Sequence, residues 1–134
     1  MPHLTALAAN TVTVDELDDT LVIGFAKLDR DGVPEQYLTL QRSLDPDEDE
    51  PGIDGVYVER DDPRFCGYGG IVRFVLQRDR VLMDLDERIG RALGDQDVWS
   101  QGTILFQVDD LEFAMLREGL GRLFVDCACF VDQA

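Results

Sequence analysis

The chain has 134 residues, a length that corresponds to a single domain. With 45% hydrophobic and 30% charged residues, it has the composition of a globular protein and not of a disordered one. Its 28 acidic and 12 basic residues give a net charge of −16, which repels nucleic acids and anionic membranes and attracts cationic partners. We therefore expect no nucleic-acid partner and no membrane association.

The cysteine and histidine content argues against a metal site. A structural zinc site needs four suitably spaced ligands, and Cys66, Cys127, Cys129 and His3 do not provide that spacing. The N-terminus also lacks the basic and then apolar order of a secretion signal. We expect a cytoplasmic protein in a reducing compartment, without cofactors. Its oligomeric state stays open, and a homodimer contact near the C-terminal cysteines is one option.

Alternation of apolar and polar residues predicts strands through most of the chain. The acidic segment 45–55 contains Pro and Gly and predicts a loop, "QRDR" (77–80) predicts a hairpin turn, and 86–97 predicts a polar crossover with one helical turn. In chain order, the clear strands are expected at 21–25, 37–41, 56–60, 72–76, 81–85 and 99–108, after a weaker one at 11–14.

One helix is expected after the last strand. Asp109 or Asp110 can cap it, and Glu112 places negative charge in its first turn, where the helix dipole favours it. The glycines at 119 and 121 disfavour a helix interior, so the helix ends near Glu118 or continues to Phe124. Its apolar face is formed by Phe113, Leu116, Leu120 and Leu123.

These elements predict an α+β class. The chain 1–134 is expected to form a single domain, with a mainly antiparallel β-sheet of about six strands and one C-terminal helix packed on it.

The motif "CGYGGI" (66–71) has three possible interpretations. A phosphate-binding loop requires a helix after the glycines, and here a strand follows. A nucleophilic Cys66 needs a base, but His3 is distant in sequence, and Asp61 and Asp62 have the wrong charge to activate a thiol. We predict a tight or bulged strand entry that uses Gly67, Gly69 and Gly70 before Ile71 and presents Tyr68.

Acidic charge is concentrated just before this motif. Residues 45–62 contain nine acids and one arginine, and so carry half of the net charge. A solvated loop or a generally acidic proteome would explain such charge without a partner. We predict instead one acidic, tyrosine-bearing surface that binds a basic protein. It consists of Asp45, Asp47, Glu48, Asp49, Glu50, Tyr57, Glu59, Asp61, Asp62 and Tyr68.

Three stretches resemble a known family. "YLTLQRSL" (37–44), "GVYVERDD" (55–62) and "CGYGGIVRFVLQRDRVLMDLD" (66–86) are similar to immunity protein family ten of bacterial polymorphic toxin systems. The resemblance implies a non-catalytic protein that binds and neutralises a cognate toxin made by the same bacterium. The matching motif residues are Gln41, Arg42, Ser43, Tyr57, Glu59, Tyr68, Gly69, Gly70 and Ile71, and structural roles are expected for Gln41, Arg42, Ser43, Gly67, Gly69, Gly70 and Ile71.

The residue chemistry and the resemblance therefore favour an inhibitor of a basic toxin. Two alternatives stay open, a general interaction or oligomeric scaffold domain and a small enzyme that uses Cys66. A scaffold would expose a large apolar patch in place of an acidic one.

Overall fold

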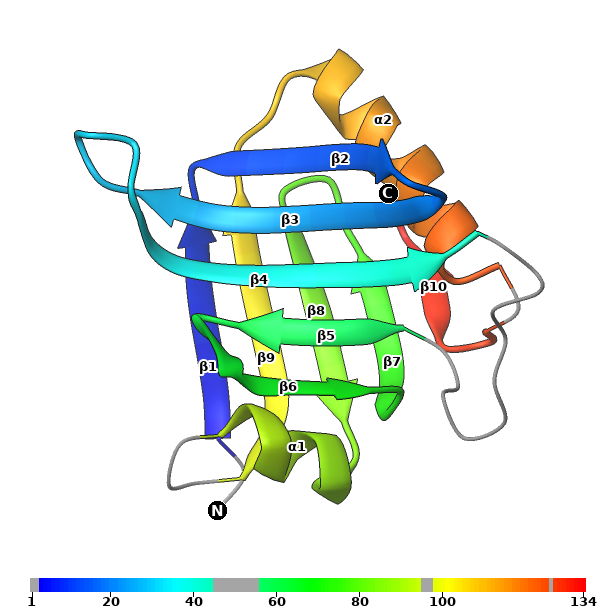
Figure 1. Cartoon of the computed structure of the whole chain (residues 1–134). Helices are drawn as coiled ribbons and strands as arrows, with labels where there is room; N and C mark the ends of the chain where they lie inside the picture. The colour runs from blue at the N-terminus through cyan, green and yellow to red at the C-terminus, as the bar shows by residue number, and fades with distance from the viewer. Residues whose placement is uncertain (1–2, 45–55, 95–97, 126) are drawn as a thin grey trace.

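The structure is a computed structural model that describes residues 3–44, 56–94, 98–125 and 127–134. Within these residues, ten strands form two five-stranded sheets, with two helices at their edges (Figure 1). One sheet lies in front in Figure 1, and its strands run across those of the sheet behind it. We call them the front sheet and the back sheet.

The front sheet is an antiparallel meander in which each strand pairs with the next in sequence. Leu21, Ile23 and Phe25 alternate with less buried residues and are fully buried, so one face of the sheet belongs to the core. The strands are β2 (Thr11–Leu17), β3 (Thr20–Leu28), β4 (Pro34–Ser43), β5 (Tyr57–Arg60) and β6 (Asp62–Tyr68).

The back sheet has the strand order β1-β9-β8-β7-β10. Its central hairpin, β7–β8, is antiparallel, as the "QRDR" turn predicted, but both outer strands join in parallel. The strands are β1 (His3–Ala9), β7 (Ile71–Leu76), β8 (Arg80–Leu85), β9 (Trp99–Phe106) and β10 (Phe130–Asp132). Parallel pairing is possible because the paired strands are far apart in sequence.

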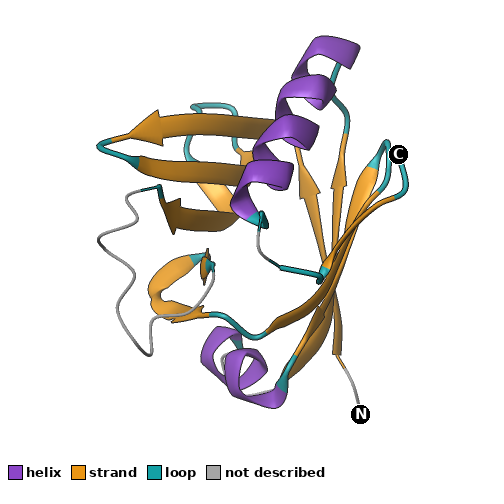
Figure 2. Ribbon diagram, turned by 90° about the vertical axis from the view of Figure 1, so that its right-hand side faces the viewer, coloured by secondary structure: helices purple, strands orange, loops and turns teal. Residues whose placement is uncertain are grey.

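The two helices close opposite ends of the space between the sheets, as Figure 2 shows. Helix α2 (Asp110–Leu123) buries Phe113, Leu116, Leu120 and Leu123, which confirms the predicted apolar face. Helix α1 (Glu87–Leu93) buries Ile89 and Leu93 at the other end. Each fully buried leucine in these helices contributes roughly 1.5–3 kcal/mol to the free energy of folding, because its apolar surface is removed from water.

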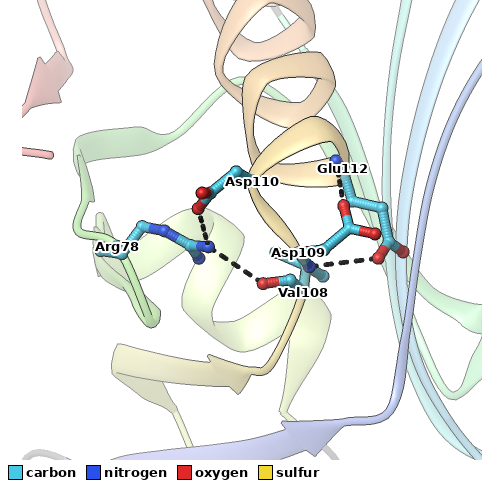
Figure 3. Close-up of polar contacts among 5 residues, drawn as sticks. All are labelled: Arg78, Val108, Asp109, Asp110 and Glu112. Carbon is cyan, nitrogen blue, oxygen red and sulfur yellow. Dashed lines mark hydrogen bonds and ion pairs between the residues drawn. The ribbon is translucent and has the colours of Figure 1, made fainter.

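The start of α2 is fixed by side-chain hydrogen bonds. Asp109 is the N-cap: its carboxylate accepts from the Glu112 amide over 2.8 Å, and the Glu112 side chain accepts from the Asp109 amide over 3.2 Å. Arg78, in the β7–β8 turn, donates to the Val108 carbonyl over 3.0 Å and to Asp110 over 2.9 Å (Figure 3). The hairpin turn of the back sheet is thereby joined to the start of the helix.

The "CGYGGI" motif carries the chain from the front sheet to the back sheet. Tyr68 ends β6, Gly69 and Gly70 turn the chain, and Ile71 begins β7. The two glycines have φ values of 69° and 87°, which other residues rarely adopt. A Cβ atom on Gly70 would lie 2.6 Å from Ile89 in α1, so this crossing also needs the absence of a side chain.

The α+β class is confirmed, but the predicted single sheet of about six strands with one helix is wrong. Strands β1 and β10 pair in parallel with remote segments, a contact that local alternation does not encode. Strand β6 was not expected, and it contains Pro63 and Gly67, two residue types that are depleted in strands. The expected helical turn is the seven-residue helix α1, and residues 3–9, where no strand was expected, form β1.

The C-terminal cysteines also differ from the expectation of reduced thiols. Cys127 and Cys129 form a disulfide across a single residue, in the turn between α2 and β10, whereas Cys66 is a free, half-buried thiol.

Helix α2 continues past both of its glycines, and the two have different surroundings. A Cβ atom added to Gly121 would meet no described atom within 4 Å. We expect Gly121→Ala to raise the free energy of unfolding by about 0.5–1 kcal/mol, because alanine loses less backbone entropy in a helix. Urea-induced unfolding followed by circular dichroism measures this change.

Gly119→Ala is the matched control. A Cβ atom there would lie 2.9 Å from Val14 and 3.3 Å from Ile23, so these side chains or the helix would have to shift. We expect this substitution to be neutral or destabilising. Equal stabilisation by both substitutions would contradict the described packing of α2.

Candidate partner-binding surface

The outward face of the front sheet gathers the tyrosines of the chain. Leu38, Leu40 and Val58 point into the core, so the alternate residues of β4, β5 and β6 point outward. Strand register places Gln41 opposite Tyr57 and Tyr57 opposite Tyr68, and Thr39 opposite Glu59 and Glu59 opposite Cys66. We call the surface formed by Tyr37, Gln41, Tyr57, Glu59 and Tyr68 the tyrosine face.

Glu59 is the centre of this face. The Tyr37 hydroxyl donates to one carboxylate oxygen of Glu59 and the Tyr57 hydroxyl donates to the other, each over 2.6 Å. Both bonds are short, as expected for hydroxyl donors to a charged acceptor. They hold one carboxylate in a single orientation on a half-buried sheet surface.

The two tyrosines of this network are poor acids. Burial raises the pKa of Tyr37 and of Tyr57 well above the ordinary value of about 10, and their hydrogen bonds to the negative carboxylate raise both further. Both hydroxyls therefore remain protonated donors at neutral pH. The carboxylate keeps its two bonds under physiological conditions.

Tyr68 is the most accessible aromatic residue of the face. Its side chain is 46% exposed, and its ring centroid lies 5.1 Å from that of Tyr57 at an interplanar angle of 57°. Arg88 of α1 donates to the Tyr68 carbonyl over 2.7 Å, which fixes the backbone next to the glycine crossing. A positioned, half-exposed tyrosine is typical of protein-binding hot spots.

The predicted acids Asp61 and Asp62 lie at the β5–β6 turn and are paired locally. Asp61 is 3.1 Å from Arg60, and its carboxylate also accepts from the Tyr37 amide over 2.8 Å. Asp62 accepts from the amide and the guanidinium of Arg64, and these bonds hold the pKa of Asp62 below its usual value. Both acids are therefore balanced by arginines, and less negative charge is available here than the sequence suggests.

The remaining predicted acids, Asp45, Asp47, Glu48, Asp49 and Glu50, lie outside the described residues. The end of β4 just before them contacts the β2–β3 turn, because the Leu44 amide donates to the Asp19 carbonyl over 2.7 Å. Asp18 and Asp19 both have a positive φ in this turn. The sequence reasoning did not include these two acids, which only the β2–β3–β4 pairing brings next to Leu44.

The "QRS" motif is divided between the two faces of β4. Gln41 belongs to the tyrosine face, whereas Arg42 pairs with buried Leu21 and donates to the Leu123 carbonyl over 2.9 Å, at the end of α2. A cation that donates to the last carbonyls of a helix stabilises that end. Ser43 lies opposite Thr20, where β4 ends and β3 begins.

Two further residues complete this description. Tyr37 is absent from the predicted site, although it alternates with Thr39 and Gln41 and so shares their face. Its hydrogen bond to Glu59, 22 residues away, is not visible in the local sequence pattern.

Gly67 lies within β6, where a Cβ atom would come within 2.5 Å of Ile89. It is a packing contact between β6 and α1.

Cys66 and His3, the nucleophile and base of the enzyme alternative, lie on different sheets. Cys66 lies on the outer face of β6, opposite Glu59, whereas His3 belongs to β1 of the back sheet. In the described part of the chain, no group of three or more His, Cys, Asp or Glu residues could hold a metal ion. None of the helices described here has the length and apolar character needed to cross a membrane.

The fold and the tyrosine face together define a small two-sheet α+β protein in which Gln41, Tyr57, Glu59 and Tyr68 meet on one outward sheet surface. Comparison with known families gives the class: the model of the family Immunity protein 10 matches residues 8–114. The chain belongs to this family of immunity proteins, which confirms the resemblance. No curated protein matches the sequence.

The Glu59 network can be tested by tyrosine titration. The chain has three tyrosines, so Tyr68→Phe leaves only Tyr37 and Tyr57 to ionise. We expect the absorbance change of these two tyrosines at 295 nm to begin well above pH 10. Adding Glu59→Gln is expected to lower the pKa of both tyrosines only in part, because burial is the larger cause of the raised pKa. Titration of both near pH 10 before unfolding would contradict the network.

The same pKa shifts predict a pH dependence of stability. The folded-state pKa of both tyrosines exceeds the unfolded value of about 10, so their contribution is complete below pH 10 and is lost as the pH rises above it. We expect the free energy of unfolding, measured in urea, to fall less steeply above pH 10 in Tyr37→Phe than in the parent chain. An unchanged slope would show that Tyr37 does not titrate with a raised pKa.

Proposed function

We propose that this chain is a non-catalytic immunity protein that binds and neutralises a cognate toxin in the cytoplasm of the bacterium that makes both. The binding surface is the tyrosine face, extended by the acids next to it. The observation that carries this proposal is the arrangement of Glu59 between two tyrosine hydroxyls beside the half-exposed Tyr68, in a chain that belongs to the immunity protein family.

The chemistry of this surface suits a basic partner. Glu59 is a fixed carboxylate between aromatic rings, an environment in which an arginine or lysine of the toxin gains both an ion pair and a contact with a ring face. The net charge of −16 raises the rate of encounter with a basic protein, and this effect weakens with salt. The acids Asp45, Asp47, Glu48, Asp49 and Glu50 remain a sequence-based part of this proposal.

The toxin encoded by the same bacterium is the partner to test, by calorimetric titration at low and at high salt. We expect Tyr68→Ala to weaken binding by about 30-fold, the effect of losing a hot-spot side chain of about 2 kcal/mol. Glu59→Gln is expected to weaken binding and to reduce its salt dependence, because it removes one charge and leaves the side-chain volume unchanged.

A matched control distinguishes the surface from total charge. Asp84 lies in β8 of the back sheet, so Asp84→Lys and Asp47→Lys change the net charge equally at different places. We expect Asp47→Lys to weaken binding and Asp84→Lys to leave it nearly unchanged. If Tyr68→Ala and Glu59→Gln leave the affinity for the toxin unchanged, the tyrosine face is not the binding surface. If the unmodified chain does not bind the toxin, the proposal of toxin neutralisation itself is rejected.

A further inference from the structure

A cavity of about 200 Å³ lies between the two sheets, beside the tyrosine face. Leu7 of β1, Leu38 of β4, Met83 of β8 and Ile104 of β9 supply aliphatic walls, and Trp99 supplies an aromatic one. An engineered cavity of about 150 Å³ with an apolar lining binds benzene. The space is therefore sufficient for one six-membered ring. The cavity here also has polar lining residues, which are Gln36, Tyr37, Arg60, Asp61 and Thr103.

Arg60 gives this apolar cavity a polar end. Its side chain is only 13% exposed, and its guanidinium carbon lies 4.2 Å from the ring centroid of Phe65 and 4.6 Å from that of Trp99. The Nε atom donates to the Leu93 carbonyl. Contacts with two rings and a fixed acceptor hold the guanidinium plane at the cavity wall.

The charge of Arg60 is already balanced inside the protein. Its Nη1 atom is 3.1 Å from Asp61, and Asp61 is itself held by two hydrogen bonds with the backbone of Tyr37. A second carboxylate in the cavity would add an uncompensated negative charge, so a neutral ligand is favoured. Among the described residues, Arg60 makes its hydrogen bonds through Nε and Nη1. The two N–H groups of Nη2 are left to donate to a carbonyl oxygen of a ligand.

We propose that the cavity binds a small neutral molecule that consists of one six-membered ring and one carbonyl oxygen. The ring occupies the space between Leu7, Met83, Ile104 and Trp99, and the oxygen accepts a hydrogen bond from Arg60. Tyr37 and Asp61 belong both to the cavity lining and to the proposed toxin surface, but this proposal does not rest on toxin binding.

The chain provides its own reporter, because Trp99 is its only tryptophan and lines the cavity. In ¹H–¹⁵N spectra of the full chain, the single indole N–H signal is followed during titration with benzamide. We expect a saturable shift with a dissociation constant on the order of 1 mM. Benzene lacks the acceptor and benzoate carries a charge, and each is expected to bind at least about tenfold more weakly.

Substitutions at the cavity wall test whether benzamide binds in the cavity. Leu7→Phe places a ring in the cavity and is expected to abolish the benzamide shift. Arg60→Lys keeps a positive charge next to Asp61 but removes the planar donors, and is expected to weaken benzamide about tenfold while leaving benzene unchanged. Arg64→Lys is the matched control, because Arg64 is close in sequence but 77% exposed, and it should have no effect.

Several results would overturn the proposal. These are the absence of a saturable shift in the unmodified chain, equal binding of benzamide, benzene and benzoate, or undiminished benzamide binding in Leu7→Phe. If Leu7→Phe does not fold, the comparison of benzamide, benzene and benzoate binding in the unmodified chain decides whether the proposal holds. Loss of toxin binding in folded Leu7→Phe, without binding of any probe, would assign the cavity to a toxin side chain and reject a small-molecule ligand.

Discussion

Each sheet of this protein has one apolar face, and burial of the two faces against each other is the constraint on which the rest of the structure depends. Phe25 of the front sheet and Phe106 of the back sheet meet across this core, with ring centroids 6.1 Å apart. The strands of the two sheets run across one another, so the space between them is open at its ends, where α1 and α2 close it. The glycines at 67, 70 and 119 lie where chain segments must approach these helices or pass from one sheet to the other.

The outward face of the front sheet is free to carry function because its inward face already supplies the stability. Glu59, Tyr37 and Tyr57 form a closed hydrogen-bonded group whose members come from two strands and are held by the sheet register. A sheet surface holds such groups more rigidly than a loop does, which reduces the entropy lost on binding a partner.

How far the sequence predicts this surface can be judged from individual residues. Tyr57 and Glu59 share a face through the alternation of one predicted strand, and the pairing of β5 with β6 brings Tyr68 next to them. Their role in binding stays a prediction. Asp61 and Asp62 were selected for their charge, and the structure pairs both with arginines. Tyr37 was missed, since its contact with Glu59 depends on which strands are neighbours. The cavity and the position of Arg60 in its wall also depend on the packing of two sheets and are not visible in any single segment.

The sequence by itself determined the α+β class, the alternating strands β2 to β5 of the front sheet, the β7–β8 hairpin, the capped start of α2 and the resemblance to the family. These features depend on residues that are close in sequence, where periodicity, capping and turn chemistry act directly. Only the tertiary structure decided that the strands divide into two sheets, that β1 and β10 join the back sheet in parallel, and that α2 continues through Gly119 and Gly121. These outcomes depend on burying remote apolar surfaces together, and no local pattern records which remote surface a segment will meet.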